Sequence, residues 1–195
     1  LEKNVGSIEH GAAASLTVDL PPYSSSTFLV KGRLSGMSIG LSPVDVQATG
    51  GRLQRLVLST GEGFPATIRQ ASVLVGSRFY SLVHGDGLLQ LDQSNGIFAD
   101  LRNRSGGRLN PAFDPDFDQY REIDEAFDDL YEVLTLRSLG FADRASASHF
   151  ELPPGQMRVF VYAPAPGSLA VQADQSADQV GRVLYTWDFQ SAFAP

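Results

Sequence analysis

Residues 66–83, ATIRQASVLVGSRFYSLV, carry the strongest indication of the fold. Two apolar runs, Ala66–Val75 and Arg78–Val83, flank the dipeptide Gly76-Ser77. A two-residue loop that begins with glycine is typical of the tight turn of a β-hairpin, because its backbone twist matches that of the flanking strands. The segment therefore predicts two adjacent antiparallel strands.

Further short strands are predicted on both sides of this hairpin. At residues 16–20, Leu16, Val18 and Leu20 alternate with polar residues, which is the period of a half-buried strand. The other predicted strands lie at residues 27–30, 37–41, 44–46, 53–58, 88–91, 97–101, 157–162, 169–173 and 183–189. Residues 88–91 are also compatible with a single helical turn.

One amphipathic helix is predicted at residues 119–139, after a loop at 102–118 that is rich in glycine, proline and arginine. Apolar residues recur there at steps of three and four, which places them on one helix face. They are Tyr120, Ile123, Phe127, Leu130 and Leu134. Asp118 is a suitable N-cap, and Gly140 marks the end of the helix.

Many short strands with a single late helix indicate a mainly β protein, an antiparallel β-sandwich. The number of strands favours a jelly roll over the alternative, an immunoglobulin-like sandwich. The length of 195 residues suits one domain. We therefore predict a single domain over 1–195, with a loop-plus-helix insertion at 102–140.

Composition excludes several classes of protein. The chain has no cysteine, so it has neither disulfides nor thiolate metal sites. Its net charge of −7 argues against general nucleic-acid binding through phosphate contacts. No run approaches the roughly 18 apolar residues of a membrane-spanning helix, so no transmembrane segment is expected.

The negative charge is concentrated in one segment. Residues 114–132 contain nine acidic residues and a single arginine, a net charge of −8, which leaves the rest of the chain close to neutral. Four of these carboxylates have the 1, 3, 5, 12 spacing of a calcium-binding loop. They are Asp114, Asp116, Asp118 and Glu125. Pro115 and Gln119 depart from that pattern, so an acidic, solvated helix start is favoured and no metal or other cofactor is expected.

A serine-hydrolase motif is also present in outline. Residues 36–40, Gly-Met-Ser-Ile-Gly, match the G-x-S-x-G elbow around Ser38, and His149 could complete a triad. The elbow requires a helix after the serine, whereas Pro43 and the residues around it indicate a strand. The three histidines show no paired metal-ligand spacing. We therefore do not expect an enzyme, and a small hydrolase using Ser38 is the least favoured alternative.

Two surface features are candidates for interaction. The first is an arginine-rich loop whose charges could pair with acidic residues, within the chain or on a neighbouring copy. Its cations and the facing acids are Arg102, Arg104, Arg108, Glu122, Asp128 and Asp129. The second is the aromatic face formed by Tyr185, Trp187 and Phe189, which could stack on sugar rings but at this spacing more often belongs to a core.

Two segments resemble a known family. Residues 53–58, LQRLVL, and 71–82, ASVLVGSRFYSL, resemble a hairpin of single-jelly-roll major capsid proteins from icosahedral viruses with an internal membrane, the tectivirus–adenovirus lineage. The resemblance implies a structural assembly protein, a subunit of a virion shell that self-assembles with copies of itself or with related capsid subunits, and proximity to a membrane. The alternative is a carbohydrate-binding β-sandwich module of a secreted, extracellular protein.

Overall fold

The computed structural model describes residues 7–9, 15–17, 39–50, 52–94, 97–102, 131–164 and 182–190. The chain separates into two compact units, Leu1–Met37 and Ser38–Pro195. In the first unit, β1 (Ser7–Glu9) pairs antiparallel with β2 (Ser15–Thr17). The expectation of one domain with an insertion at 102–140 stays a prediction, since residues 103–130 lie outside the described residues.

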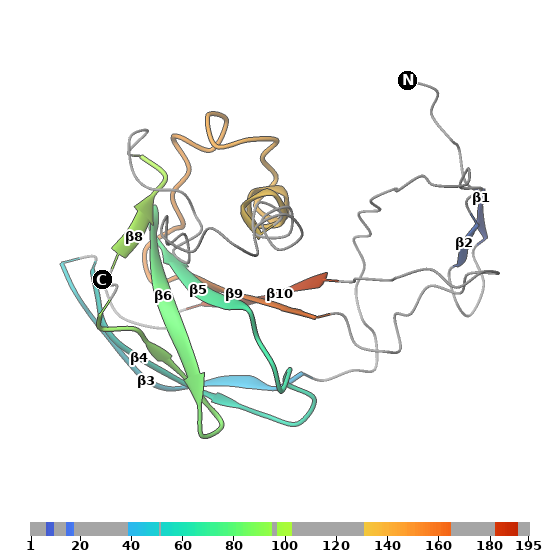
Figure 1. Cartoon of the computed structure of the whole chain (residues 1–195). Helices are drawn as coiled ribbons and strands as arrows, with labels where there is room; N and C mark the ends of the chain where they lie inside the picture. Colours follow the sequence, from blue (N-terminus) through green and yellow to red (C-terminus); the bar gives the residue numbers. More distant parts are fainter. Residues whose placement is uncertain are drawn as a thin grey trace, which may run out of the picture. The chain divides into compact units, whose positions relative to one another are not determined.

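The second unit contains one antiparallel sheet, which confirms the mainly β prediction. Its strands are β3 (Leu41–Thr49), β4 (Arg52–Thr60), β5 (Gln70–Val75), β6 (Arg78–Gly85), β7 (Leu88–Leu91), β8 (Ile97–Asp100), β9 (Met157–Pro164) and β10 (Arg182–Phe189). They follow the order β10-β9-β5-β6-β7-β4-β3, and β8 pairs with β6 (Figure 1). The described strands thus form one continuous curled sheet, and the two-sheet jelly roll is not confirmed.

Most predicted strands match observed ones, with one informative difference. The strand predicted at 44–46 is part of a longer strand, β3, which begins at Leu41, because Pro43 stays within the ladder and is accommodated by a register shift before Asp45. Of the strand predicted at 37–41, residues 37 and 38 lie outside the described residues, and residues 39 and 40 precede β3. The strands predicted at 27–30 and 169–173 lie outside the described residues. Residues 88–91 form strand β7 and not a helical turn.

The β5–β6 hairpin has the predicted turn. Val75 pairs with Arg78, so Gly76 and Ser77 form a two-residue loop. Gly76 has a φ of +59°, and Ser77 has a negative φ. A positive φ at the first central residue alone is the pattern of a type II′ turn, which glycine adopts without steric cost.

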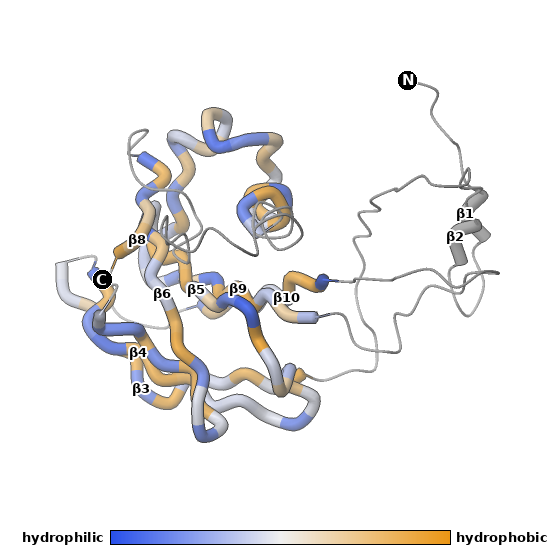
Figure 2. The backbone as a smooth tube through the Cα atoms, viewed as in Figure 1, coloured by the Kyte–Doolittle hydropathy of each residue, from blue (hydrophilic) through white to orange (hydrophobic). Residues whose placement is uncertain are grey.

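The curled sheet has a core on its inner face, and part of its opposite face is covered by a second core. On its inner face, strands β3, β4 and β7 meet β5, β6 and β9 around an inner core (Figure 1). This inner core comprises Leu41, Leu53, Leu56, Leu58, Ala71, Val73, Val75, Tyr80, Leu82, Leu89, Met157, Val159 and Val161. Figure 2 shows both hydrophobic and hydrophilic positions along β4, in which Leu53, Leu56 and Leu58 are buried and Gln54 and Arg55 are exposed.

The opposite face of the sheet carries an outer core, which the helix at 131–138 and the segment after it cover. Its buried members are Leu74, Phe79, Ala99, Leu101, Tyr131, Leu136, Ala147, Leu152, Phe160 and Tyr162. Central strands β5 and β9 contribute to both cores, which explains why their sequences are apolar on both faces.

The helix ends where the sequence predicts. Gly140 has a φ of +92°, and its N–H donates to the Arg137 carbonyl at 3.0 Å. The N–H of Phe141 donates to the Leu136 carbonyl at 2.9 Å. These two bonds form a Schellman motif, in which glycine takes the left-handed position just beyond the helix. Residues 119–130 of the predicted helix lie outside the described residues.

Across the described ranges, the structure contains no helix that is long and apolar enough to cross a membrane.

Candidate assembly surface

The last glycine of the G-x-S-x-G motif, Gly40, has a role in packing. Ser38 lies outside the described residues, but Gly40 leads directly into strand β3 rather than into the helix that a nucleophile elbow requires. The Gly40 carbonyl accepts a hydrogen bond from Gly61 N–H at 2.8 Å. A Cβ on Gly40 would lie 3.1 Å from the Gly61 Cα, so the motif's last glycine permits close backbone approach.

The candidate calcium ligands Asp114, Asp116, Asp118 and Glu125 lie outside the described residues. Within the part of the chain that the structure describes, no three His, Asp or Glu side chains gather where they could hold a metal ion.

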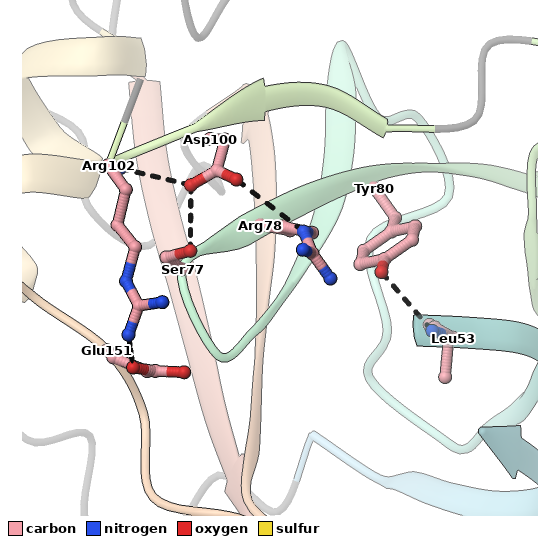
Figure 3. A network of polar contacts seen from close by, with 7 residues as sticks. All are labelled: Leu53, Ser77, Arg78, Tyr80, Asp100, Arg102 and Glu151. Atoms are coloured by element: carbon pink, nitrogen blue, oxygen red, sulfur yellow. Dashed lines mark hydrogen bonds and ion pairs between the residues drawn. The ribbon is translucent and has the colours of Figure 1, made fainter. Parts of the chain in front are cut away.

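The arginine loop is visible at its first residue, Arg102, which has partners within its own chain (Figure 3). The guanidinium of Arg102 forms an ion pair with Glu151, and the main-chain N–H of Arg102 donates to Asp100 Oδ1 at 3.0 Å. The other predicted interaction residues, Arg104, Arg108, Glu122, Asp128 and Asp129, lie outside the described residues. The sequence predicts acidic partners within the chain or on a neighbouring copy. The partner described for Arg102, Glu151, belongs to the same chain.

Asp100 connects this loop to the hairpin turn. Its Oδ1 also accepts the Ser77 hydroxyl at 2.7 Å, and its Oδ2 pairs with Arg78 Nε at 3.5 Å (Figure 3). A main-chain hydrogen bond joins the same turn to the residue after β8, since the Leu101 N–H donates to the Ser77 carbonyl at 2.9 Å. The cluster therefore fixes the turn and the end of β8. Exposed ion pairs of this kind typically contribute about 0–1 kcal/mol each.

The aromatic face of β10 lies at the margin of the inner core. Tyr185, Trp187 and Phe189 are half-buried and pack against it. The Trp187 ring is stacked between two neighbours, Tyr185 at 6.1 Å and Phe64 at 6.0 Å between ring centroids. Its Nε1–H donates to the Ile39 carbonyl at 3.2 Å, which ties β10 to the residues just before β3. Partial burial raises the pKa of Tyr185.

An open cleft of about 300 Å³ lies beside the start of β4 and the end of β7. Its lining residues are Arg52, Leu53, Gln54, Tyr80, Leu91, Asp92, Gln93 and Ile97. The Tyr80 hydroxyl accepts the Leu53 N–H at 3.2 Å (Figure 3), so one wall of the cleft is braced by a buried side chain. The volume is at the lower limit for small-molecule sites.

The two strands at the ends of the main strand order, β3 and β10, differ strongly as edges of the sheet. Strand β3 contains Pro43, and its register with β4 shifts twice, between Pro43 and Asp45 and between Gln47 and Ala48. Proline and bulges are devices by which natural sheets prevent further pairing at an edge. Strand β3 is thus a protected edge.

Strand β10 has none of these devices. All eight of its residues, Arg182–Phe189, pair with β9 without a register shift. The run RVLYTWDF contains neither proline nor glycine and is rich in β-branched and aromatic residues. Among the strands that the structure describes, β9 is its single partner. We call the outer side of Val183–Phe189 the open edge.

No protein-family model, curated protein or solved structure matches this chain.

The open edge is the feature that the sequence did not predict. The aromatic alternation of residues 183–189 indicated a strand but not its position in the sheet. One available signal was Pro43, because a proline inside a strand favours an edge position. Pro43 identifies β3 as an edge strand. The edge position of β10 depends on the pairing of strands that are distant in the sequence, which Pro43 does not indicate.

Proposed function

We propose that this chain is a structural assembly protein that acts through protein–protein contacts and not through catalysis. The observation that supports this function best is the open edge, a regular row of backbone groups along Val183–Phe189 for which β9 is the one partner strand among the described residues. An unprotected edge strand is a template for pairing with another chain. A protein that functions alone is expected to protect both edges of its sheet, as this chain does at β3.

The specific form that we propose is a subunit of a virion shell, with a jelly-roll sandwich as the complete fold and the curled sheet as its described part. The hairpin of β5 and β6, which resembles that of single-jelly-roll capsid proteins, supports this form. The partners are then further copies of this chain or related subunits. Complementary charges at such contacts determine orientation more than affinity.

The oligomeric state tests this function. Light scattering over a wide range of protein concentrations should show a mass that rises with concentration. Association that depends on surface charges should also weaken as added salt screens them. A monomer at every concentration and salt condition would contradict the proposal.

A carbohydrate-binding module is the second candidate, and the half-exposed row of Tyr185, Trp187 and Phe64 favours it. Aromatic rings arranged in a row can stack on successive sugar rings. Trp187 is the sole tryptophan, so its fluorescence reports on this row alone. Quenching by soluble polysaccharides that saturates with concentration would support this candidate, whereas unchanged emission across a polysaccharide panel would exclude binding at this row.

A further inference from the structure

The cleft beside the start of β4 lies where the strand ladders separate. On one side of β6, β8 pairs with Arg78–Tyr80 and β7 pairs with Leu82–Gly85. The described register of β4 with β7 covers Val57–Ser59 and does not reach the first residues of β4. The Tyr80 side chain extends from β6 toward β4 and accepts the Leu53 N–H there (Figure 3). The cleft therefore draws its lining from four strands and the loop between β7 and β8.

Half of the lining residues are apolar or aromatic. Leu53 and Tyr80 are buried, and Leu91 is half-buried at the end of β7. Ile97, the first residue of β8, lines the same cleft and is 41% exposed. A large apolar side chain that remains exposed next to buried ones favours a ligand with an apolar part, because covering Ile97 removes its surface from water.

The polar side chains of the cleft offer donors to a ligand. Arg52, Gln54 and Gln93 are exposed, and no hydrogen bond or ion pair of their side chains is found in the part of the chain that the structure describes. The guanidinium of Arg52 stays charged at every physiological pH and carries donors without an acceptor. Arg52 therefore favours an anionic group on the ligand.

The Tyr80 hydroxyl adds a buried donor. Its oxygen accepts the Leu53 N–H at 3.2 Å, and Tyr80 is only 2% exposed. A phenol can donate one hydrogen bond as well as accept, and no acceptor for the Tyr80 O–H is found among the described residues. A buried donor without an acceptor is unfavourable, so an oxygen atom of a ligand in the cleft would be stabilised by this hydroxyl.

We propose that this cleft binds a small apolar monocarboxylic acid. The carboxylate would accept charge-assisted hydrogen bonds from Arg52, with the Tyr80 hydroxyl as a further donor. The apolar part of the acid would cover Leu91 and Ile97. The volume of about 300 Å³ equals that of about ten water molecules in the liquid, which suits an aromatic or short aliphatic acid. This site is independent of the proposed assembly function.

Asp92, the one acidic residue of the lining, restricts the charge of the ligand. Its Oδ1 accepts the Ser94 N–H at 2.9 Å and the Ser94 hydroxyl at 2.6 Å. A carboxylate at the cleft repels an anion, and this repulsion increases with the charge of the ligand. A single negative charge, balanced by Arg52, therefore fits this lining better than the double charge of phosphate.

Titration of the full chain with benzoate, followed by nuclear magnetic resonance, tests the site. Amide signals of residues 52–54 and 91–93 should shift and reach saturation, and the Leu53 amide reports directly on the Tyr80 hydroxyl. Arg52→Gln should weaken binding roughly tenfold or more, since it removes a charged hydrogen-bond donor. Arg55→Gln is the matched control, because Arg55 is an exposed arginine of the same strand that does not line the cleft. Its affinity for benzoate should equal that of the unmodified protein.

Two further probes define the ligand class. Inorganic phosphate has charge without an apolar part, and benzyl alcohol has the apolar ring without charge. Each should bind about tenfold more weakly than benzoate or less tightly still. Shifts that do not saturate, equal affinities of Arg52→Gln and the unmodified protein, or phosphate binding as tight as that of benzoate would each overturn the proposal. Saturable binding of benzoate to a protein that stays monomeric would support this site while contradicting the assembly function.

Discussion

The contact between Ser72 and Tyr131 shows how one buried hydrogen bond positions the helix on the sheet. The two hydroxyl oxygens lie 2.5 Å apart, and both residues have no exposed surface. The Tyr131 ring also packs against Tyr162 on β9, with 5.7 Å between ring centroids. The first described turn of the helix is therefore joined to β5 by a polar contact and to β9 by a ring contact.

Removing one hydroxyl of this pair should destabilise the protein more than removing both. Tyr131→Phe leaves the Ser72 hydroxyl buried without this partner, which costs about 1–3 kcal/mol in the free energy of unfolding. The double variant S72A/Y131F removes both polar groups and should recover part of that loss. Urea unfolding of the unmodified protein and the three variants, including Ser72→Ala, measures the coupling. Additive effects of the two single substitutions would show that the hydroxyls do not interact.

The same residue makes stability dependent on alkaline pH. Burial raises the pKa of the Tyr131 phenol well above its ordinary value, since a phenolate in the outer core would lose its hydration. The unfolded chain releases this proton at about pH 10, at which the folded protein retains it. The contribution of Tyr131 is therefore fully present below about pH 10 and decreases as the pH rises further. Urea midpoints measured from neutral to alkaline pH should fall more steeply for the unmodified protein than for Tyr131→Phe, and parallel curves would contradict this assignment.

At the level of the strands, a close backbone contact between Gly40 and Gly61 lies where β3 begins and β4 ends. Leu41 pairs with Thr60, and the next two residues outward, Gly40 and Gly61, approach so closely that neither has space for a side chain. A Cβ on Gly61 would lie 3.0 Å from the Gly40 Cα. This position requires glycine because of main-chain proximity and not because of its backbone angles.

Substitution at Gly61 should therefore be costly, while a nearby glycine in open space should tolerate the same change. Gly61→Ala forces the two chain segments apart, and we expect a loss of about 1–3 kcal/mol in unfolding free energy. Gly85→Ala is the matched control, since nothing lies within 4 Å of a Cβ placed there. Its effect should stay within about 0.5 kcal/mol. Thermal or urea unfolding of the two variants compares them, and equal losses would refute the role of the contact.

Local signals in the sequence predicted individual elements well. The Gly76-Ser77 turn and the helix stop at Gly140 each depend on residues adjacent in sequence, so their patterns are legible without the fold. Sheet order depends on distant segments, because β9 lies between β5 and β10 and pairs Val73 with Val159. The ion pair of Arg102 with Glu151 is equally non-local. Residue types showed that Arg102 needs an acidic partner but not which of the acids it contacts.

For the whole molecule, the two edges of the curled sheet predict where solvent protection changes on assembly. Amides at the open edge are available for pairing, and amide exchange with solvent is slowed when a hydrogen bond to another chain forms. Hydrogen exchange of the segment 182–189 should therefore slow as protein concentration increases. Exchange of the protected edge, residues 41–49, should remain the same, which makes β3 an internal control. Equal slowing at both strands would indicate general stabilisation by association, and slowing at β3 alone would place the interface at the opposite edge.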